Sequence, residues 1–272
     1  MYAKDFEYDG HHLSDYGFII CTITGNTDVE TISAGSKLAF NIVKRHNGKL
    51  YSLASTSYEE CISTTFEICK DPCVNDNIAI SNDEYRDIMR WLNRREFLDF
   101  QIVNDDVGLN DDPCIFKASF NIDKITYGGM LYGLSLTATT DKPFGYGMPR
   151  KVTLQFPNSS TVKKYIDISD EIGYIYPNLK ITVNQSGDLI LENKSQNCKT
   201  IIKNCVSGEV ITIDGEAHII SSNKVAHKIY NDFNYSFFKI GNNYDDRMNH
   251  ITASLPCTVE ISYVPIVKDI PN

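Results

Sequence analysis

The chain has 272 residues, of which 42% are hydrophobic and 22% are charged, a composition that is ordinary for a folded globular protein and argues against intrinsic disorder. A chain of this length exceeds the size at which a single hydrophobic core usually stops growing, so two domains are expected. The formal net charge of −9 argues against binding to free duplex nucleic acid, because such binding depends on lysine and arginine contacts with phosphates.

The N-terminal segment does not resemble a secretion signal. It carries Lys4, Asp5, Glu7 and Asp9 where a signal peptide requires an apolar run. No uninterrupted apolar stretch approaches the roughly 20 residues that a membrane-spanning helix requires. We therefore expect synthesis in the cytoplasm and no membrane span.

The first half of the chain shows the periodicity of β-strands. Within residues 62–68, Ile62, Phe66 and Ile68 alternate with polar side chains. Such alternation predicts one face in a core and the other facing water or a partner. The same pattern returns at residues 116–122 and 132–138, and the dipeptides Asn47-Gly48 and Gly128-Gly129 are typical of hairpin turns.

One helix is predicted over residues 81–95, between these strands. Ser81 is placed to cap its N-terminus, and Glu84 three positions later completes a capping box. The apolar positions of the segment fall on one helical stripe: Tyr85, Ile88, Met89 and Leu92. We expect this helix to cover a sheet. The N-terminal domain is therefore predicted to be a β-barrel or sandwich with one α-helix, not a βαβ array.

A domain boundary is predicted within residues 141–149, where two prolines and two glycines fall in nine positions and interrupt any regular element. The predicted domains are residues 1–147 and residues 148–272. The second one reads as all-β, with alternation at residues 152–156, 179–183, 189–191 and 259–263. Turn signals such as Ser186-Gly187-Asp188 follow one another closely, which is typical of an antiparallel sandwich.

The eight cysteines do not form a recognisable metal-binding pattern. Cys69 and Cys73 have three residues between them and Cys198 and Cys205 have six, so no two tight pairs complete a four-ligand zinc site. Without a secretion signal, a disulfide framework is not expected in a chain of this length. We expect buried or half-buried free thiols.

The sequence contains no motif of nucleotide binding, zinc proteolysis or serine hydrolysis. His11 and His12 would point in opposite directions in a strand, and neither His218 nor His227 has an evident partner. The acidic segment 104–112 lacks the ligand spacing of a calcium loop. The sequence therefore singles out no catalytic, cofactor-binding or metal-binding residue, and an enzyme is not expected.

Several segments resemble the distal tail proteins (Dit) of tailed bacteriophages. In the first half they are FEYDG (residues 6–10), SDYGF (14–18), RHNGKL (45–50), IMRWL (88–92) and DDPCIFKA (111–118). In the second half they are YPNLKI (176–181), IDGE (213–216) and NDFN (231–234). Each motif is weak alone, but their order and their span from about residue 6 to residue 264 make the resemblance specific.

The resemblance implies a structural protein that forms a hexameric ring at the distal end of a phage tail or phage-tail-like particle. The N-terminal domains would form a belt joining the tail tube to the hub or fibre protein. The C-terminal domain would be a galectin-like sandwich. Receptor-binding proteins that attach to this domain are further candidate partners. Residues 151–272 leave no room for an inserted carbohydrate-binding module, so we expect the short, architectural form. In such a ring, a polar strand face such as Ser63, Thr65 and Glu67 is a candidate for lining joints between subunits.

An alternative from another class is a carbohydrate-binding, lectin-like module acting in recognition of the host surface. Sugar sites usually present an aromatic platform, but the only tryptophan, Trp91, lies on the predicted helix of the first domain. The remaining platforms in the second domain are Tyr174, Tyr176, Tyr230 and Tyr235. Tyrosines in strands more often serve packing. A hydrolase, the third class, has no motif to support it.

Overall fold

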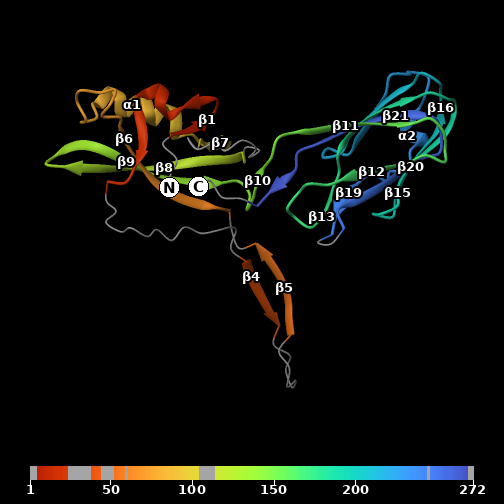
Figure 1. Cartoon of the computed structure of the whole chain (residues 1–272), viewed down its shortest axis with the longest axis horizontal. Coiled ribbons are helices and arrows are strands. Elements are labelled where there is room, and N and C mark those ends of the chain that lie inside the picture. Colours follow the sequence, from red (N-terminus) through yellow and green to blue (C-terminus); the bar gives the residue numbers. More distant parts are fainter. Residues whose placement is uncertain are drawn as a thin grey trace. The chain divides into compact units, whose positions relative to one another are not determined.

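The computed structural model describes residues 5–23, 38–43, 52–58, 61–103, 114–243 and 246–268 (Figure 1). The protein is mainly β, as predicted, and neighbouring strands in its seven-stranded, five-stranded and four-stranded sheets are antiparallel. The chain divides into two compact units, residues 1–147 with 267–272 and residues 148–266, which we call the N-terminal unit and the C-terminal unit. None of the helices in the described ranges has the length and apolarity needed to cross a membrane. That residues 1–147 and 148–272 fold as separate domains stays a prediction.

The N-terminal unit is built on a seven-stranded sheet with the order β2-β1-β7-β8-β9-β6-β3. Its strands are β1 (Asp5–Tyr8), β2 (His11–His12), β3 (Phe18–Cys21), β6 (Ser63–Lys70), β7 (Leu98–Val103), β8 (Phe116–Tyr127) and β9 (Met130–Thr140). The 3-10 helix η1 (Leu13–Tyr16) lies between β2 and β3 in the chain, while β4 (Leu38–Val43) and β5 (Ser52–Tyr58) pair as a separate hairpin. The short strands β10 (Gly145–Tyr146) and β22 (Ile266–Val267) pair with each other.

Helix α1 (Asn82–Leu92) begins as predicted. The Ser81 Oγ accepts a hydrogen bond from the Glu84 N–H, and the Glu84 carboxylate accepts one from the Ser81 N–H, which completes the capping box. Glu84 also accepts a hydrogen bond of 2.7 Å from the buried Lys70 at the end of β6. This contact with Lys70 is the main cause that lowers the pKa of Glu84. The helix therefore starts from a fixed position beside the sheet.

The predicted end of the helix at residue 95 is wrong, because α1 ends at Leu92. Asn93 serves as the C-cap, and its backbone N–H donates to the carbonyl oxygen of Met89. Its side-chain amide donates instead to the carbonyl oxygen of Phe120 in β8 at 3.2 Å. This side-chain hydrogen bond ties the C-terminal end of the helix to β8.

The predicted alternation in the N-terminal unit is confirmed by burial. Phe66 and Ile68 of β6 are buried, as are Phe116, Ala118 and Phe120 of β8 and Leu134, Leu136 and Ala138 of β9. The Gly128-Gly129 turn is also confirmed, since both glycines have positive φ values (58° and 84°) between β8 and β9. The predicted turn at Asn47-Gly48 and the acidic segment 104–112 lie outside the described residues.

The C-terminal unit contains a five-stranded and a four-stranded sheet. The first has the order β11-β21-β14-β17-β18 and the second the order β12-β20-β15-β16. Their strands are β11 (Arg150–Phe156), β12 (Val162–Ile166), β14 (Asn178–Val183), β15 (Gly187–Asn193), β16 (Cys198–Cys205), β17 (Val210–Asp214), β18 (Ile219–Ser222), β20 (Met248–Ala253) and β21 (Cys257–Tyr263). A small pair is formed by β13 (Gly173–Ile175) and β19 (Ile240–Asn242), and α2 (Ile229–Asp232) is a single short turn of helix.

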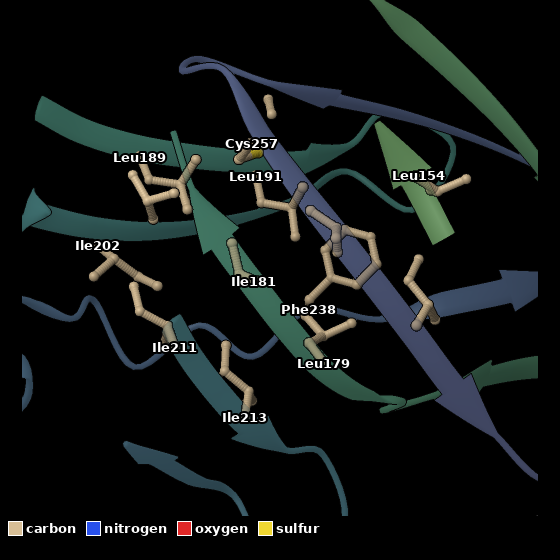
Figure 2. Close-up of a cluster of buried hydrophobic side chains, with 14 of the residues drawn as sticks. Leu154, Leu179, Ile181, Leu189, Leu191, Ile202, Ile211, Ile213, Phe238 and Cys257 are labelled. Carbon is tan, nitrogen blue, oxygen red and sulfur yellow. The ribbon is translucent and has the colours of Figure 1, made fainter. Parts of the chain in front are cut away.

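The core of the C-terminal unit joins the two sheets. Figure 2 shows Leu179 and Ile181 of β14 gathered in one cluster with Leu189 and Leu191 of β15. These four residues belong to the positions that the sequence predicted to be buried, and each is at most 3% exposed. The predicted antiparallel sandwich is thus confirmed as two sheets that share one apolar interior.

Candidate assembly surface

One face of the seven-stranded sheet is occupied by helix α1 (Figure 1). Trp91 of this helix stacks on Phe6 of β1 and on Tyr16 of η1, with ring centroids 5.5 and 4.5 Å apart. Ile88 and Leu92 are fully buried beside it. This face of the sheet is therefore the core of the N-terminal unit.

The opposite face of the same sheet carries polar side chains. The register pairs Thr65 of β6 with Thr137 of β9, and their hydroxyl oxygens lie 3.0 Å apart in a hydrogen bond. The neighbouring positions of β6, β8 and β9 are mostly polar and are exposed or half-buried, whereas Ile19, Cys21 and Cys69 continue the same face toward β3 with less polar side chains. We define the polar sheet face as Ser63, Thr65, Glu67, Ser119, Asn121, Asp123, Ser135, Thr137 and Thr139.

The chemistry of the polar sheet face suits contact with another protein. Threonine and serine are short, so they leave a sheet surface flat while keeping hydroxyls that both donate and accept hydrogen bonds. Part of this capacity is used within the unit, since Ser119 Oγ donates to the carbonyl oxygen of Arg94 at 2.7 Å and the Glu67 carboxylate accepts from the Ile23 N–H. The predicted residues Ser63, Thr65 and Glu67 thus lie together on one face of β6.

The seven-stranded sheet has two edges. Strand β2 forms one, and β3 forms the other by pairing with β6 through Phe18–Cys21. In the part of the chain that the structure describes, the outer side of β3 has no neighbouring strand. An edge strand presents backbone groups that can pair with a strand of another chain.

The hairpin of β8 and β9 extends past the neighbouring strands (Figure 1). The pairing of β6 with β9 ends at Cys69 and Gly133, while β8 and β9 continue to the pair Tyr127 and Met130. Tyr127 is 81% exposed and Met130 is 54% exposed. The tip therefore presents an aromatic and a thioether side chain to the surroundings.

The structure describes all eight cysteines and the first two histidines. All eight cysteines are free thiols. His12 contacts Asp5 through Nδ1 at 3.2 Å, and His11 is exposed. Across the described ranges, no group of three or more His, Cys, Asp or Glu side chains is placed to hold a metal ion.

His218 and His227 had no evident partner in the sequence, but both have close neighbours in the structure. The imidazole of His218 lies edge-on between Tyr176 and Phe237, with ring centroids 4.8 and 4.6 Å away. His227 Nδ1 lies 2.6 Å from a carboxylate oxygen of Glu209. Nothing in the local sequence indicates this pair, because Glu209 and His227 meet only when the segment before α2 folds against the turn that precedes β17.

The four candidate tyrosines fall into two pairs. The rings of Tyr174 and Tyr176 contact each other, and the ammonium of Lys239 lies over the Tyr174 ring. Tyr230 and Tyr235 are 58% and 64% exposed, and the Tyr235 hydroxyl donates to the carbonyl oxygen of Tyr230. Tyr230 lies on α2, while Tyr174 lies on β13.

Comparison with known protein families decides the class of the protein. Residues 1–142 match the family model described as a phage tail protein N-terminal domain, and residues 144–263 match the one described as a phage tail C-terminal domain. The chain belongs to this family of phage tail proteins. No curated protein matches the chain.

The fold of this phage tail protein is also found in a solved structure. The crystal structure of the Dit protein (gp 19.1) of phage SPP1 superposes with a TM-score of 0.63 and covers 96% of this chain and 98% of that one, at 9% sequence identity. That protein is described as a paradigm of the hub adsorption apparatus in phages infecting Gram-positive hosts. The phage tail protein therefore has a Dit-like fold, as its sequence resemblance predicted.

Proposed function

We propose that this phage tail protein is the subunit of a hexameric ring at the distal end of the tail. The N-terminal units form the belt that joins the tail tube to the hub or fibre protein. The C-terminal units, with a galectin-like sandwich, offer surfaces for receptor-binding proteins. The family and the Dit-like fold support a structural role in the tail, and the protein acts without catalysis.

The polar sheet face is the observation that carries this proposal. A closed ring requires that one surface of a subunit meets a different surface of the next, so each subunit needs two distinct contact surfaces. The N-terminal unit offers the polar sheet face as one and the open edge of β3 as the other. Interfaces between separately folded proteins have a polar rim and about one hydrogen bond per 100–200 Å², and the hydroxyl, amide and carboxylate groups of this face can supply such hydrogen bonds.

A charge placed on the polar sheet face tests the proposal. In Thr65→Arg, a guanidinium replaces a hydroxyl at the centre of the face, where it has to lose water if a neighbouring subunit covers it. The matched control is Thr212→Arg, because Thr212 is also an exposed strand threonine hydrogen-bonded to a neighbouring hydroxyl, but in the C-terminal unit.

The readout is the number of complete tails in lysates, counted by negative-stain electron microscopy after complementation with each variant. We expect normal tails with Thr212→Arg and a loss of at least about tenfold with Thr65→Arg, although both purified variants keep the wild-type circular dichroism spectrum. Normal tail numbers with Thr65→Arg would show that the polar sheet face takes no part in tail assembly.

A further inference from the structure

The hairpin of β4 and β5 lacks the neighbours that a β-ribbon needs. Within the described ranges, its two strands pair only with each other, and no other described element makes an extensive contact with either strand. A two-stranded hairpin without a third strand or a packed face is only marginally stable in water. We therefore expect another surface to cover this hairpin in the assembled protein.

One face of the hairpin is apolar. The register places Leu38 opposite Tyr58 and Phe40 opposite Thr56, so these side chains share one face of the ribbon. Leu38 is 48% exposed and Phe40 is 60% exposed, whereas Tyr58 is half-buried with the ammonium of Lys268 over its ring. Exposed apolar side chains that lie next to one another indicate a contact surface.

The edge of the seven-stranded sheet at β3 carries a second apolar surface. Ile19 and Cys21 are half-buried and alternate with the buried positions of β3. Ile23 is 41% exposed, and its Cδ1 lies in the space that a Cβ at Gly133 would take. Cys69 of β6 lies opposite Ile19 and is half-buried. We define the β3 patch as Ile19, Cys21, Ile23 and Cys69.

The strands of both surfaces carry no charged residue. Edge strands are usually protected against pairing by charged side chains, above all lysine, as on β12 with Lys163 and Lys164. Strands β3, β4 and β5 have no such side chain, and the Glu67 carboxylate beside the β3 patch accepts a hydrogen bond from the Ile23 N–H. Because the chain has a net charge of −9, two copies repel each other except where the touching surfaces are uncharged. The two surfaces therefore suit contact with a second copy of the chain.

We propose that the apolar face of the hairpin in one subunit packs on the β3 patch of the next subunit in the ring. Leu38 and Phe40 of one copy cover Ile19 and Ile23 of its neighbour. The contact is heterologous, so every copy gives one hairpin and receives one, as ring closure requires. This inference rests on the proposed hexameric ring and adds the hairpin to the sheet edge that the ring already uses.

Photo-crosslinking in complete tails tests which surface covers the hairpin. The full chain carries p-benzoylphenylalanine in place of Phe40, a change that keeps an aromatic ring at this exposed position. After irradiation, we expect products at multiples of the chain mass on a denaturing gel, and mass spectrometry should join position 40 to the β3 patch of a second copy. The same photoreactive residue in place of Ser57, which lies on the opposite face of the hairpin, is the matched control and should give few such products.

A charge on the apolar face gives an independent test. In Phe40→Asp, a carboxylate has to lose water where the neighbouring subunit covers it, so we expect complete tails to decrease at least about tenfold after complementation. Ser57→Asp adds the same charge to the opposite face of the same hairpin and should leave tail numbers unchanged. Both positions are exposed, so both purified variants should keep the wild-type unfolding midpoint.

Several results would overturn the hairpin contact. Cross-links from position 40 that stay within one chain, or that reach a different tail protein or another surface of the neighbouring copy, would each do so. Normal tail numbers with Phe40→Asp would equally overturn it. In all these cases a six-fold ring in wild-type tails would leave the proposed function standing, whereas absence of the protein from the tail tip would reject the ring itself.

Discussion

The indole Nε1 of Trp91 donates a hydrogen bond of 3.0 Å to the main-chain carbonyl oxygen of Tyr8, 83 positions earlier in the chain. Because Trp91 lies on α1 and Tyr8 on β1, this bond ties the helix to the first strand of the seven-stranded sheet. Both side chains are buried. The contact therefore links local helix formation to the folding of the whole N-terminal unit.

Trp91→Phe tests this link. The variant keeps an aromatic ring against Phe6 but removes the donor and part of the ring, so we expect the free energy of unfolding to fall by about 1–3 kcal/mol. Urea unfolding followed by circular dichroism measures the change, since the variant lacks the only tryptophan. Arg90→Ala, which breaks only an exposed ion pair with Asp87, should stay within about 0.5 kcal/mol of the wild type. Equal effects of the two variants would mean that the Trp91 contact does not anchor the helix.

Leu92→Ala tests whether the two units have separate cores. The side chain is completely buried, and its removal leaves a cavity under α1 that should cost about 2–5 kcal/mol. Differential scanning calorimetry should show an early transition for the N-terminal unit and an unchanged one for the C-terminal unit. An equal decrease in the transition temperatures of both units would show that the units unfold together.

Ser81→Ala tests the helix cap. Loss of the side-chain acceptor leaves the Glu84 N–H unpaired, so we expect a decrease of about 1 kcal/mol in the free energy of unfolding. Ser81→Asp retains an acceptor at the same place and should stay close to the wild type. An unchanged urea midpoint in Ser81→Ala would show that the cap is not needed for stability.

Acid should destabilise the C-terminal unit through Glu209. Burial opposes ionisation of this carboxyl group, but the hydrogen bonds from Ser222, His227 and the Val206 N–H outweigh it, so the pKa of Glu209 lies below the ordinary value of a glutamate. A carboxyl group whose pKa is lower in the folded than in the unfolded state stabilises the folded protein. This stabilisation is complete above the pKa of the unfolded state, and it is lost as the pH falls through the pKa of the folded state.

Thermal unfolding between pH 7 and pH 3 measures this effect. The midpoint of the C-terminal unit should decrease most steeply below about pH 4.5, and Glu209→Gln should flatten the decrease while lowering the midpoint at pH 7. A wild-type pH profile in Glu209→Gln would assign the acid sensitivity to other carboxyl groups.

Local sequence patterns predicted the regular elements well. The alternation in β6, β8 and β9 and the capping box at Ser81 depend on neighbours within a few positions, so they can be recognised without the fold. The hydrogen bond from the side chain of Asn93, at the end of α1, to Phe120 could not be recognised in this way, because its partner lies in a distant strand.

Long-range pairing accounts for what the sequence did not predict. Nothing local shows that β1 lies beside β7 or that Trp91 reaches Tyr8. The cluster of Glu209, His227 and Asp232 likewise needs the segment before α2 to fold against the turn that precedes β17. The polar sheet face was indicated in part, since Ser63, Thr65 and Glu67 alternate with buried positions, but its partners on β8 and β9 follow only from the register.

Electron cryo-microscopy of intact tails, with the subunit identified by a fused tag, is the most direct test of the proposed place of this protein. We expect six copies closing around the axis at the far end of the tail, with the N-terminal units innermost. Density for the tagged subunit along the shaft, or its absence from the tip, would contradict a distal ring.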